Sequence, residues 1–291
     1  MNYTEHEDAE TFLSVVQTTL ERHESINGLM LGVGLRLISE PNVYGSQPYL
    51  ATVETAGGLS VAALMTPPHK LQIYSKNDYD IAGFELLAEA LMRGKWHVPG
   101  VIARNTVAAT FAAVWSRKAG VCCRTGMRQG LYELRQVVHP SYPAGVFKQA
   151  AVEDIELVRR WAGEFHDSCF GDDRCEQSIE EAESKVKKGA LFFWVDGERM
   201  SMAARSRPTT HGEAISFVYT PPGQRGRGYA TSVVARLSQR ILDDGKQFCT
   251  LFTDMSNATS NSIYRRIGYK KVAEIAEVYF YNDTDNHRCR I

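Results

Sequence analysis

Apolar residues near the start of the chain follow first a helical and then a strand-like pattern. Within residues 8–22 they recur at spacings of three and four, from Phe12 to Leu20, which indicates one buried helical face. Two β-like runs follow, and the turn residues Ala56-Gly57-Gly58 between them are typical of a hairpin. These two expected strands are residues 48–55 and 59–66.

The rest of the first half alternates strands and helices. An aspartate near its start and Gly94 at its end are typical caps for a helix at 78–94. The other expected elements of this half are strands at 70–75 and 100–104, a helix at 106–120 and a strand pair within 121–138.

A segment with two prolines and a glycine, His139–Gly145, is the best candidate linker. We therefore expect domains at 1–140 and 150–291, joined by residues 141–149. The second half repeats the element order of the first, and such alternation predicts an α/β fold with a mixed sheet in each half. Its expected elements are helices at 151–170 and 178–189, a hairpin at 190–206, a strand at 214–219, a helix at 229–245, a strand at 248–254, a helix at 257–268 and a strand at 269–281.

Composition excludes several classes of partner. The 291 residues include 33 Lys plus Arg against 34 Asp plus Glu, so a net charge of -1 offers no general attraction to nucleic acid or to an anionic membrane. No apolar run approaches the roughly 18 residues of a membrane span, and the N-terminus lacks the apolar core of a signal peptide. We therefore expect a soluble, cytoplasmic protein.

The six cysteines favour reduced thiols over a disulfide framework, since two of them are adjacent and no even pattern emerges. His166, Cys169 and Cys175 have a spacing that metal ligands could use, but no second ligand pair follows at zinc-site spacing. We expect ordinary buried or half-exposed cysteines and no metal.

The most informative stretch is Tyr219–Thr231, which places two prolines, three glycines and two arginines between a strand and a helix. Glycines leave backbone N–H groups uncovered, and the start of a helix attracts anions, so the loop suits a phosphate or pyrophosphate. The alternative is a glycine-rich turn with two solvated arginines. The dinucleotide fingerprint fails because Thr231 occupies its third glycine position, and a P-loop fails because Gly-Lys-Ser/Thr is absent.

A second segment decides between these interpretations. Together with the loop, Asn257–Tyr269 resembles the GNAT N-acetyltransferase superfamily, whose loop is written Q/R-x-x-G-x-G/A and whose later segment is N-x-x-A-x-x-x-Y-x-x-x-G-F/Y. The loop matches at Gly226 and Gly228, whereas Gly223 stands at the Gln/Arg position, with Gln224 one residue late. The later segment matches at four positions and has Ser260 in place of the usual Ala; the four are Asn257, Tyr264, Gly268 and Tyr269.

The resemblance covers about residues 150–285 and implies binding of acetyl-CoA. Backbone of the loop would hold the pyrophosphate, backbone of the preceding strand would pair with the pantetheine arm, and Asn257 would touch that arm from the other side. The implied cofactor-binding residues are Phe217, Val218, Tyr219, Gln224, Arg225, Gly226, Arg227, Gly228, Tyr229, Ala230 and Asn257.

Two residues are candidates for proton transfer. Tyr264 stands where the family has its general acid, and the alternative is a core aromatic on a short helix. Glu213, just before the strand at 214–219, is the acid nearest to where some members carry a base; a solvated turn residue is as good a reading. The oxyanion of the intermediate would be held by a strand N–H near Val218.

The first half has the element order of a GNAT domain but no phosphate loop. Its equivalent position carries Asp78 and Asp80, which would repel phosphate at a helix start. We therefore expect two GNAT-like domains, each a mixed, mostly antiparallel twisted sheet flanked by helices, of which only the second binds acetyl-CoA.

The resemblance implies an N-acyltransferase that moves an acetyl group to a primary amine of a small molecule or peptide, with the first half shaping the acceptor pocket. One alternative is a module that senses CoA without turnover, and another is a nucleotide-binding module that uses the same loop. The sequence is also compatible with a homodimer. It does not identify the acceptor, the preferred acyl chain or the general base, which is Glu213 or water.

Overall fold

The computed structural model describes residues 1–169 and 175–282, which form two compact units. The first unit is Met1–Leu131 together with the segment from Val272 onward, and the second is Tyr132–Lys271. This division differs from the expected linker at 141–149, which lies inside the second unit. The last strand, β12 (Lys270–Tyr281), belongs almost entirely to the first unit.

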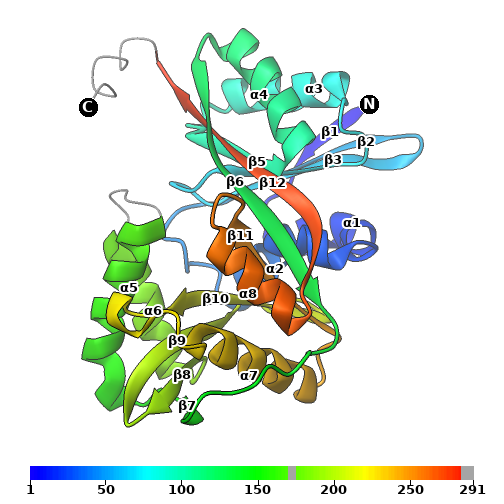
Figure 1. Ribbon diagram of the computed structural model, residues 1–291. Coiled ribbons are helices and arrows are strands. Elements are labelled where there is room, and N and C mark those ends of the chain that lie inside the picture. The colour runs from blue at the N-terminus through cyan, green and yellow to red at the C-terminus, as the bar shows by residue number, and fades with distance from the viewer. Residues whose placement is uncertain (170–174, 283–291) are drawn as a thin grey trace. The chain divides into compact units, whose positions relative to one another are not determined.

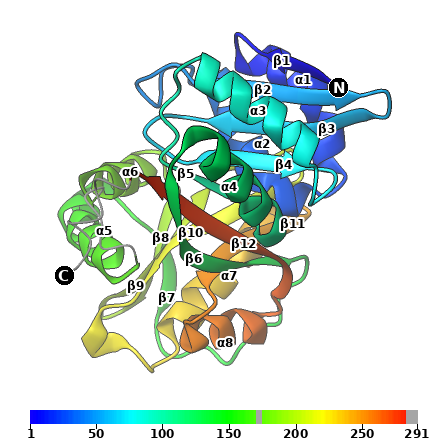
Figure 2. The same cartoon turned by 90° about the horizontal axis from the view of Figure 1, so that it is seen from above.

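The first unit is a mixed sheet in the strand order β1-β2-β3-β4-β5-β12-β6. Its neighbours pair antiparallel wherever their register is resolved, except for β4 and β5, which are parallel. The elements are β1 (Asn2–Glu5), α1 (Ala9–Glu21), α2 (Glu24–Ser39), β2 (Tyr49–Thr55), β3 (Gly58–Met65), β4 (Leu71–Ser75), α3 (Ile81–Arg93), β5 (Gly100–Arg104), α4 (Asn105–Ala119) and β6 (Cys122–Leu134). Figure 2 shows α3 and α4 on one face of this sheet and α1 and α2 on the other, and each pair of helices has its own apolar core.

Sequence patterns missed the helix α2. Gly28, Gly32 and Gly34 dilute its apolar periodicity and lower its helix propensity. A Cβ at Gly34 would lie 3.2 Å from a methyl carbon of Leu13, so this glycine allows α1 and α2 to approach closely. The expected strand pair within 121–138 is also wrong, because one long strand, β6, covers most of it.

The second unit has the strand order β11-β10-β9-β8-β7, with the end of β6 next to β11. Figure 1 shows α5 and α6 on one side of β8–β10 and α7 on the other. The elements are β7 (Val146–Gln149), α5 (Ile155–Cys169), α6 (Cys175–Lys187), β8 (Leu191–Asp196), β9 (Glu198–Ser206), β10 (Gly212–Tyr219), α7 (Tyr229–Asp243), β11 (Phe248–Asp254) and α8 (Ala258–Ile267).

Helix α7 is held to the sheet by an apolar face. Val233, Val234, Leu237 and Ile241 are fully buried and share a core with Ile215 of β10 and its neighbours. Since this face follows from the helical spacing of its residues, the sequence itself directs the start of α7 toward the end of β10.

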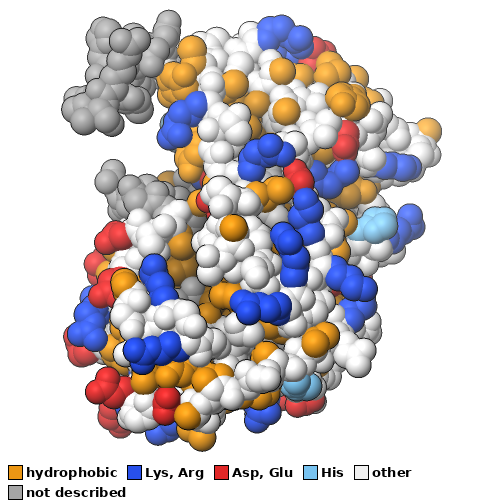
Figure 3. Space-filling model, in the orientation of Figure 1, with side chains coloured by type: hydrophobic (Ala, Val, Ile, Leu, Met, Phe, Trp, Pro, Cys, Tyr) orange, Lys and Arg blue, Asp and Glu red, His pale blue; other side chains and the backbone are white. Residues whose placement is uncertain are grey.

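The surface mixes charges of both signs. On the face shown in Figure 3, blue and red side chains intermingle over α5 and α6, where Arg159 pairs with Glu183 at 2.7 Å. Within the described ranges, no helix has both the length and the apolar character needed to cross a membrane.

Candidate functional site

Strands β10 and β11 run parallel but pair over only three residues. Gly212, Glu213 and Ala214 lie opposite Phe248, Cys249 and Thr250. In the described structure, β10 has no further β11 partner, so its last five residues, Ile215–Tyr219, diverge from β11. The divergence begins at Ile215, before Pro221 and Pro222, so these prolines do not cause it.

A bulge reshapes the diverging end of β10. Its pairing with β9 shifts register between Ser216 and Tyr219, and Phe217 has φ of +51°, a value uncommon for a residue with a side chain. Such outliers persist only where the surrounding structure enforces them. Here the buried side chains of Phe217 and Tyr219 both pack in the apolar core beneath α5 and α6. The backbone between them therefore departs from regular strand pairing.

The glycine-rich loop follows directly. Pro222–Gln224 forms a 3-10 turn, and Gly226 and Gly228 have φ of +79° and +84°, a region that glycine adopts without strain. A Cβ at Gly226 would meet nothing within 4 Å, so the conformation, and not crowding, requires glycine there. Arg225 Nε donates to the Thr220 carbonyl at 3.0 Å and closes the loop.

The N-terminus of α7 opens onto this loop. Its first helical hydrogen bond runs from Ser232 N–H to the Gly228 carbonyl at 3.0 Å, so the N–H groups of Tyr229, Ala230 and Thr231 precede the helical ladder. Tyr229 is anchored by its hydroxyl, which donates to Asp196 Oδ2 at 2.8 Å. The exposed glycines, the helix start and the exposed side chain of Arg227 together form a site suited to an anion.

Two residues of the later motif lie at the N-cap of helix α8 and within it. Asn257 caps the helix, its Oδ1 accepting from Ser260 N–H at 3.0 Å. Tyr264 is buried, and its ring packs edge-on against Tyr269 with 6.0 Å between centroids. Burial raises the pKa of Tyr264 above its ordinary value, and the nearby Cys169 thiol raises it further.

Tyr264 of α8 and Tyr269, which follows the cap residue Gly268, differ in their hydroxyl contacts. Tyr269 shares a 2.8 Å hydrogen bond with Ser238. Tyr264 makes no side-chain hydrogen bond within the described part of the chain, although Cys169, whose pKa is raised by burial, also experiences the charges of Asp254 and Arg225. The Tyr264 hydroxyl is thus not used in holding the core together.

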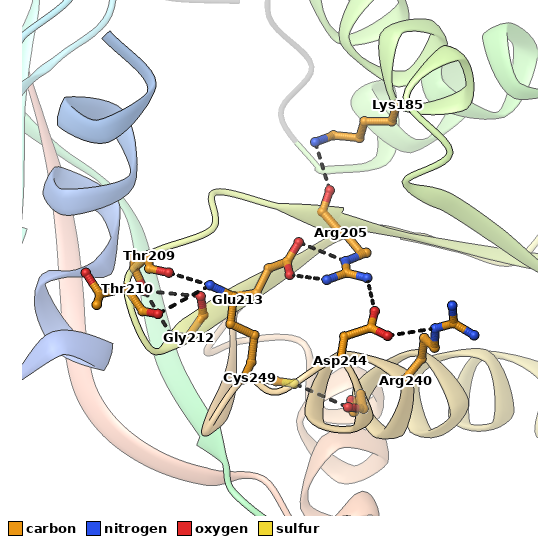
Figure 4. Close-up of polar contacts among 11 residues, drawn as sticks. Lys185, Arg205, Thr209, Thr210, Gly212, Glu213, Arg240, Asp244 and Cys249 are labelled. Atoms are coloured by element: carbon orange, nitrogen blue, oxygen red, sulfur yellow. Dashed lines mark hydrogen bonds and ion pairs between the residues drawn. The ribbon is translucent and has the colours of Figure 1, made fainter. Parts of the chain in front are cut away.

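Glu213 lies at the paired end of β10, away from the diverging residues. Figure 4 shows that its carboxylate accepts two hydrogen bonds from Arg205, with Nε–Oε1 and Nη2–Oε2 distances of 3.0 and 2.6 Å. Arg205 also donates to Asp244 at 2.5 Å, and these two carboxylates raise the pKa of Arg205. Glu213 is 6% exposed, so the reading of a solvated turn residue is wrong, and both of its oxygens are already occupied.

A cleft of about 1060 Å³ lies between α5, the β8–β9 turn and the start of the loop. Sequence analysis missed it because its residues come from three separate segments of the chain. One contact spans it: the Tyr219 hydroxyl donates to Glu164 Oε2 at 2.7 Å. Burial, and then this hydrogen bond, raise the pKa of Tyr219 to about 12. The lining residues are Leu157, Arg160, Trp161, Glu164, Asp167, Ser168, Gly197, Glu198, Arg199, Tyr219, Pro221, Pro222, Gln224 and Arg225.

His166, Cys169 and Cys175, whose spacing metal ligands could use, do not form a metal-binding cluster. His166 is buried and its Nδ1 lies 2.8 Å from Ser178 Oγ, which ties α5 to α6. In residues 1–169 and 175–282 no group of three or more His, Cys, Asp and Glu side chains is arranged to hold a metal ion. Cys289, one of the six cysteines, lies outside the described residues.

In the first unit, strands β4 and β5 also diverge, but the space beyond their paired ends is occupied by side chains. Strands β4 and β5 pair in parallel only at Leu71–Val101 and Gln72–Ile102. Arg104 donates to the Ser75 carbonyl at 2.8 Å and pairs with Asp78 at 2.6 Å. Asp80 caps α3, its carboxylate accepting from Gly83 N–H at 3.0 Å and from Ser60 Oγ at 2.5 Å. Side chains of the unit itself therefore occupy the helix start and the strand end.

Comparison with known proteins agrees with this geometry. Residues 195–279 match the family model described as FR47-like protein. The chain has the GNAT fold. It is similar over 97% of its length, and over 100% of the other chain, to a GNAT family acetyltransferase from Colwellia psychrerythraea, with 12% identity and a TM-score of 0.57. No curated protein sequence matches it.

Two further solved structures extend the similarity to both units. A Drosophila protein aligns over 96% of this chain and 98% of its own, with 14% identity and a TM-score of 0.67. A tandem GNAT protein from the clavulanic acid biosynthesis pathway aligns over 80% and 82%, with 13% identity and a TM-score of 0.52. The expectation of two GNAT-like units is therefore confirmed at the level of the fold.

Proposed function

We propose that the second unit transfers an acetyl group from acetyl-CoA to a primary amine. The observation that carries the proposal is the combination of a strand that leaves its parallel neighbour after Ala214 with a positive-φ glycine loop at the start of α7. The first offers unpaired backbone to an extended, amide-bearing arm, and the second offers N–H groups to a pyrophosphate. A helix start alone would be weak support, whereas the two features lie in sequence on one strand and its following helix.

Different segments of the second unit bind different parts of acetyl-CoA. Backbone N–H groups from Gly226 to Ala230 bind the pyrophosphate, and Arg227 adds a charge. The N–H groups of Gln224 and Arg225, expected from the sequence to take part, already donate to the carbonyls of Pro221 and Pro222. Phe217–Tyr219 pair with the pantetheine arm along the divergent edge, and an N–H near Val218 faces the carbonyl oxygen. Because Oδ1 of Asn257 is used in capping α8, the amide nitrogen of that residue is the group left to contact the arm.

The chemistry requires two proton transfers. The amine nitrogen forms a bond to the thioester carbon, the carbon–sulfur bond breaks, one proton leaves nitrogen and one reaches the departing sulfur. Tyr264 gives that second proton: its raised pKa keeps it protonated at neutral pH, and its hydroxyl is not used to tie the core together. A thiol has a reference pKa of about 8.5, so this transfer is uphill and depends on close positioning.

Glu213 is a poor general base because both of its oxygens are held by Arg205. Among the two bases considered from the sequence, water is therefore favoured. The five cysteines in the described ranges are free thiols, which favours a reducing compartment such as the cytoplasm.

The decisive experiment combines calorimetry with acetyl-CoA and release of free thiol in the presence of an amine panel. We expect binding, and consumption of acetyl-CoA that depends on an amine. Binding without consumption by any amine would favour the alternative of a CoA-sensing module. Competition by ATP or NAD, with no effect of CoA, would refute the proposal.

A further inference from the structure

The cleft beside α5 has two chemically different ends. Its α5 residues lie on one helical face, in the order Leu157, Arg160, Trp161, Glu164, Asp167 and Ser168. Carboxylates of Glu164 and Asp167 come from the C-terminal half of the helix. Arg160 comes from its N-terminal half, where the cleft is also lined by Arg199 after the β8–β9 turn.

The carboxylate end is the one close to the proposed chemistry. Ser168, at the end of α5, lines the cleft together with Arg225 of the glycine-rich loop, whose Nε donates to the Thr220 carbonyl directly after β10. Tyr219 joins the diverging strand to this end through its 2.7 Å hydrogen bond to Glu164. An amine bound at Glu164 is thus next to the backbone that we assign to the thioester.

The arginine end has unused donors. In the described structure Arg160 has no ion-pair partner. Arg199 Nη2 pairs with Asp154 at 2.7 Å, but its buried Nε has no hydrogen-bond partner. Since Glu198 also lines this end, it is not strongly positive, and recognition there depends on directed N–H groups, which suit a planar carboxylate.

One buried acceptor also has no partner. Gln224 Oε1, at the entrance of the loop, is inaccessible to solvent and makes no hydrogen bond within the described ranges. An unpaired buried polar atom is costly, so a bound molecule that donates to it would remove that penalty. The amine of an acceptor, or an amide N–H such as that of a dipeptide, supplies such a donor.

We propose that the cleft is the acceptor site and that the acceptor is an amine carrying a carboxylate several bonds away, such as a dipeptide or an ω-amino acid. The inference rests on the proposed acetyl transfer. An α-helix rises 1.5 Å per residue, so Arg160 and the carboxylates four and seven positions later are separated by roughly 6–10 Å. The amine and the carboxylate of a simple α-amino acid are too close together to reach both ends.

The test compares three acceptors: 6-aminohexanoate, glycine and hexylamine. The wild-type protein should use 6-aminohexanoate at least tenfold more efficiently than either of the other two. Arg160→Gln should remove this preference by lowering efficiency with 6-aminohexanoate at least tenfold more than with hexylamine. Arg159→Gln is the matched control, because Arg159 lies on the same helix, pairs with Glu183 and does not line the cleft.

A second variant separates the two ends. Glu164→Gln should raise the KM for both 6-aminohexanoate and hexylamine, since both carry the amine. Two results would overturn the inference while leaving acetyl transfer intact. One is equal use of 6-aminohexanoate and hexylamine by the wild type. The other is the same preference for 6-aminohexanoate over hexylamine in Arg160→Gln as in Arg159→Gln. If no amine is acetylated, the proposed function fails, and calorimetric binding of 6-aminohexanoate to CoA-saturated wild-type and Arg160→Gln proteins decides the acceptor site.

Discussion

Both carboxylate oxygens of Glu213 accept hydrogen bonds from Arg205, at 3.0 Å from Nε and 2.6 Å from Nη2. Arg205 reaches further, to Asp244 at the C-terminal cap of α7, so one guanidinium connects β9, β10 and the end of α7. This contact predicts a structural role for Glu213, which the sequence alone suggests as a general base.

Removing either partner should therefore affect stability more than the proton chemistry. Arg205→Met should lower the free energy of unfolding by about 3 kcal/mol, because it leaves the buried Glu213 without a counter-ion. Chemical denaturation measures this effect, and Asp244→Asn, which removes the more exposed carboxylate, should cost less. Glu213→Gln should keep the acid limb of the pH–rate profile; loss of that limb in a folded variant would restore Glu213 as the base.

The loop should lose its ligand when a carboxylate is placed in it. Gly226→Asp should weaken acetyl-CoA binding at least 100-fold, because it puts a negative charge among the N–H groups that we assign to the pyrophosphate. Gly45→Asp is the control, since Gly45 in the first unit also has positive φ and open space around it, and so has a similar conformational penalty. Unchanged calorimetric affinity in folded Gly226→Asp would contradict the assignment.

Tyr264→Phe should separate chemistry from binding. It keeps the ring that packs against Tyr269 and removes the hydroxyl, so turnover should fall by roughly 10²–10⁴-fold with little change in acetyl-CoA affinity. Tyr269→Phe is the matched control: it removes a hydroxyl bonded to Ser238 and should reduce stability by about 1 kcal/mol, with a smaller effect on turnover. If Tyr264→Phe keeps wild-type turnover while the chemical step limits the rate, Tyr264 is a core residue.

Calorimetric titration should give one CoA per chain. The first unit uses Asp80 to cap α3 and Arg104 to fill the end of β4, and a carboxylate at a helix start opposes phosphate. Gly226→Asp should accordingly leave no residual site. Two sites in the wild type, or one remaining in this variant, would show that the first unit also binds CoA.

A buried thiol predicts a loss of stability at alkaline pH. Burial raises the pKa of Cys249 from 9.0 to about 12, so between these values the unfolded chain releases a proton that the folded chain keeps. The stabilisation is complete below pH 9 and is lost as pH rises toward 12. Cys249→Ala should make the decline of unfolding free energy over this range shallower, by up to about 1.4 kcal/mol per pH unit. Parallel declines in the two proteins would contradict the prediction.

Local patterns predicted the elements that carry the proposed site. The strand at 214–219, the glycine loop and the amphipathic helix at 229–245 all depend on near neighbours in sequence, and the structure has them as β10, the loop and α7. Features set by distant contacts escaped prediction. Helix α2 was missed because its glycines, such as Gly34, serve a close contact with another helix and weaken the helical pattern. The carboxylate of Glu213 is held by Arg205, which comes from another strand. The cleft was missed for the same reason, because Glu164 and Tyr219 are 55 positions apart.

The last strand has a consequence for how the protein is made. In the first unit β12 lies beside β5, with Ile275 opposite Arg104 and Tyr279 opposite Gly100. During translation, residues 132–271 are complete before this strand leaves the ribosome, while β5 still lacks its neighbour. The unit that begins the chain is therefore the last to be finished, and a nascent chain that stops before residue 272 contains all of the second unit and only part of the first.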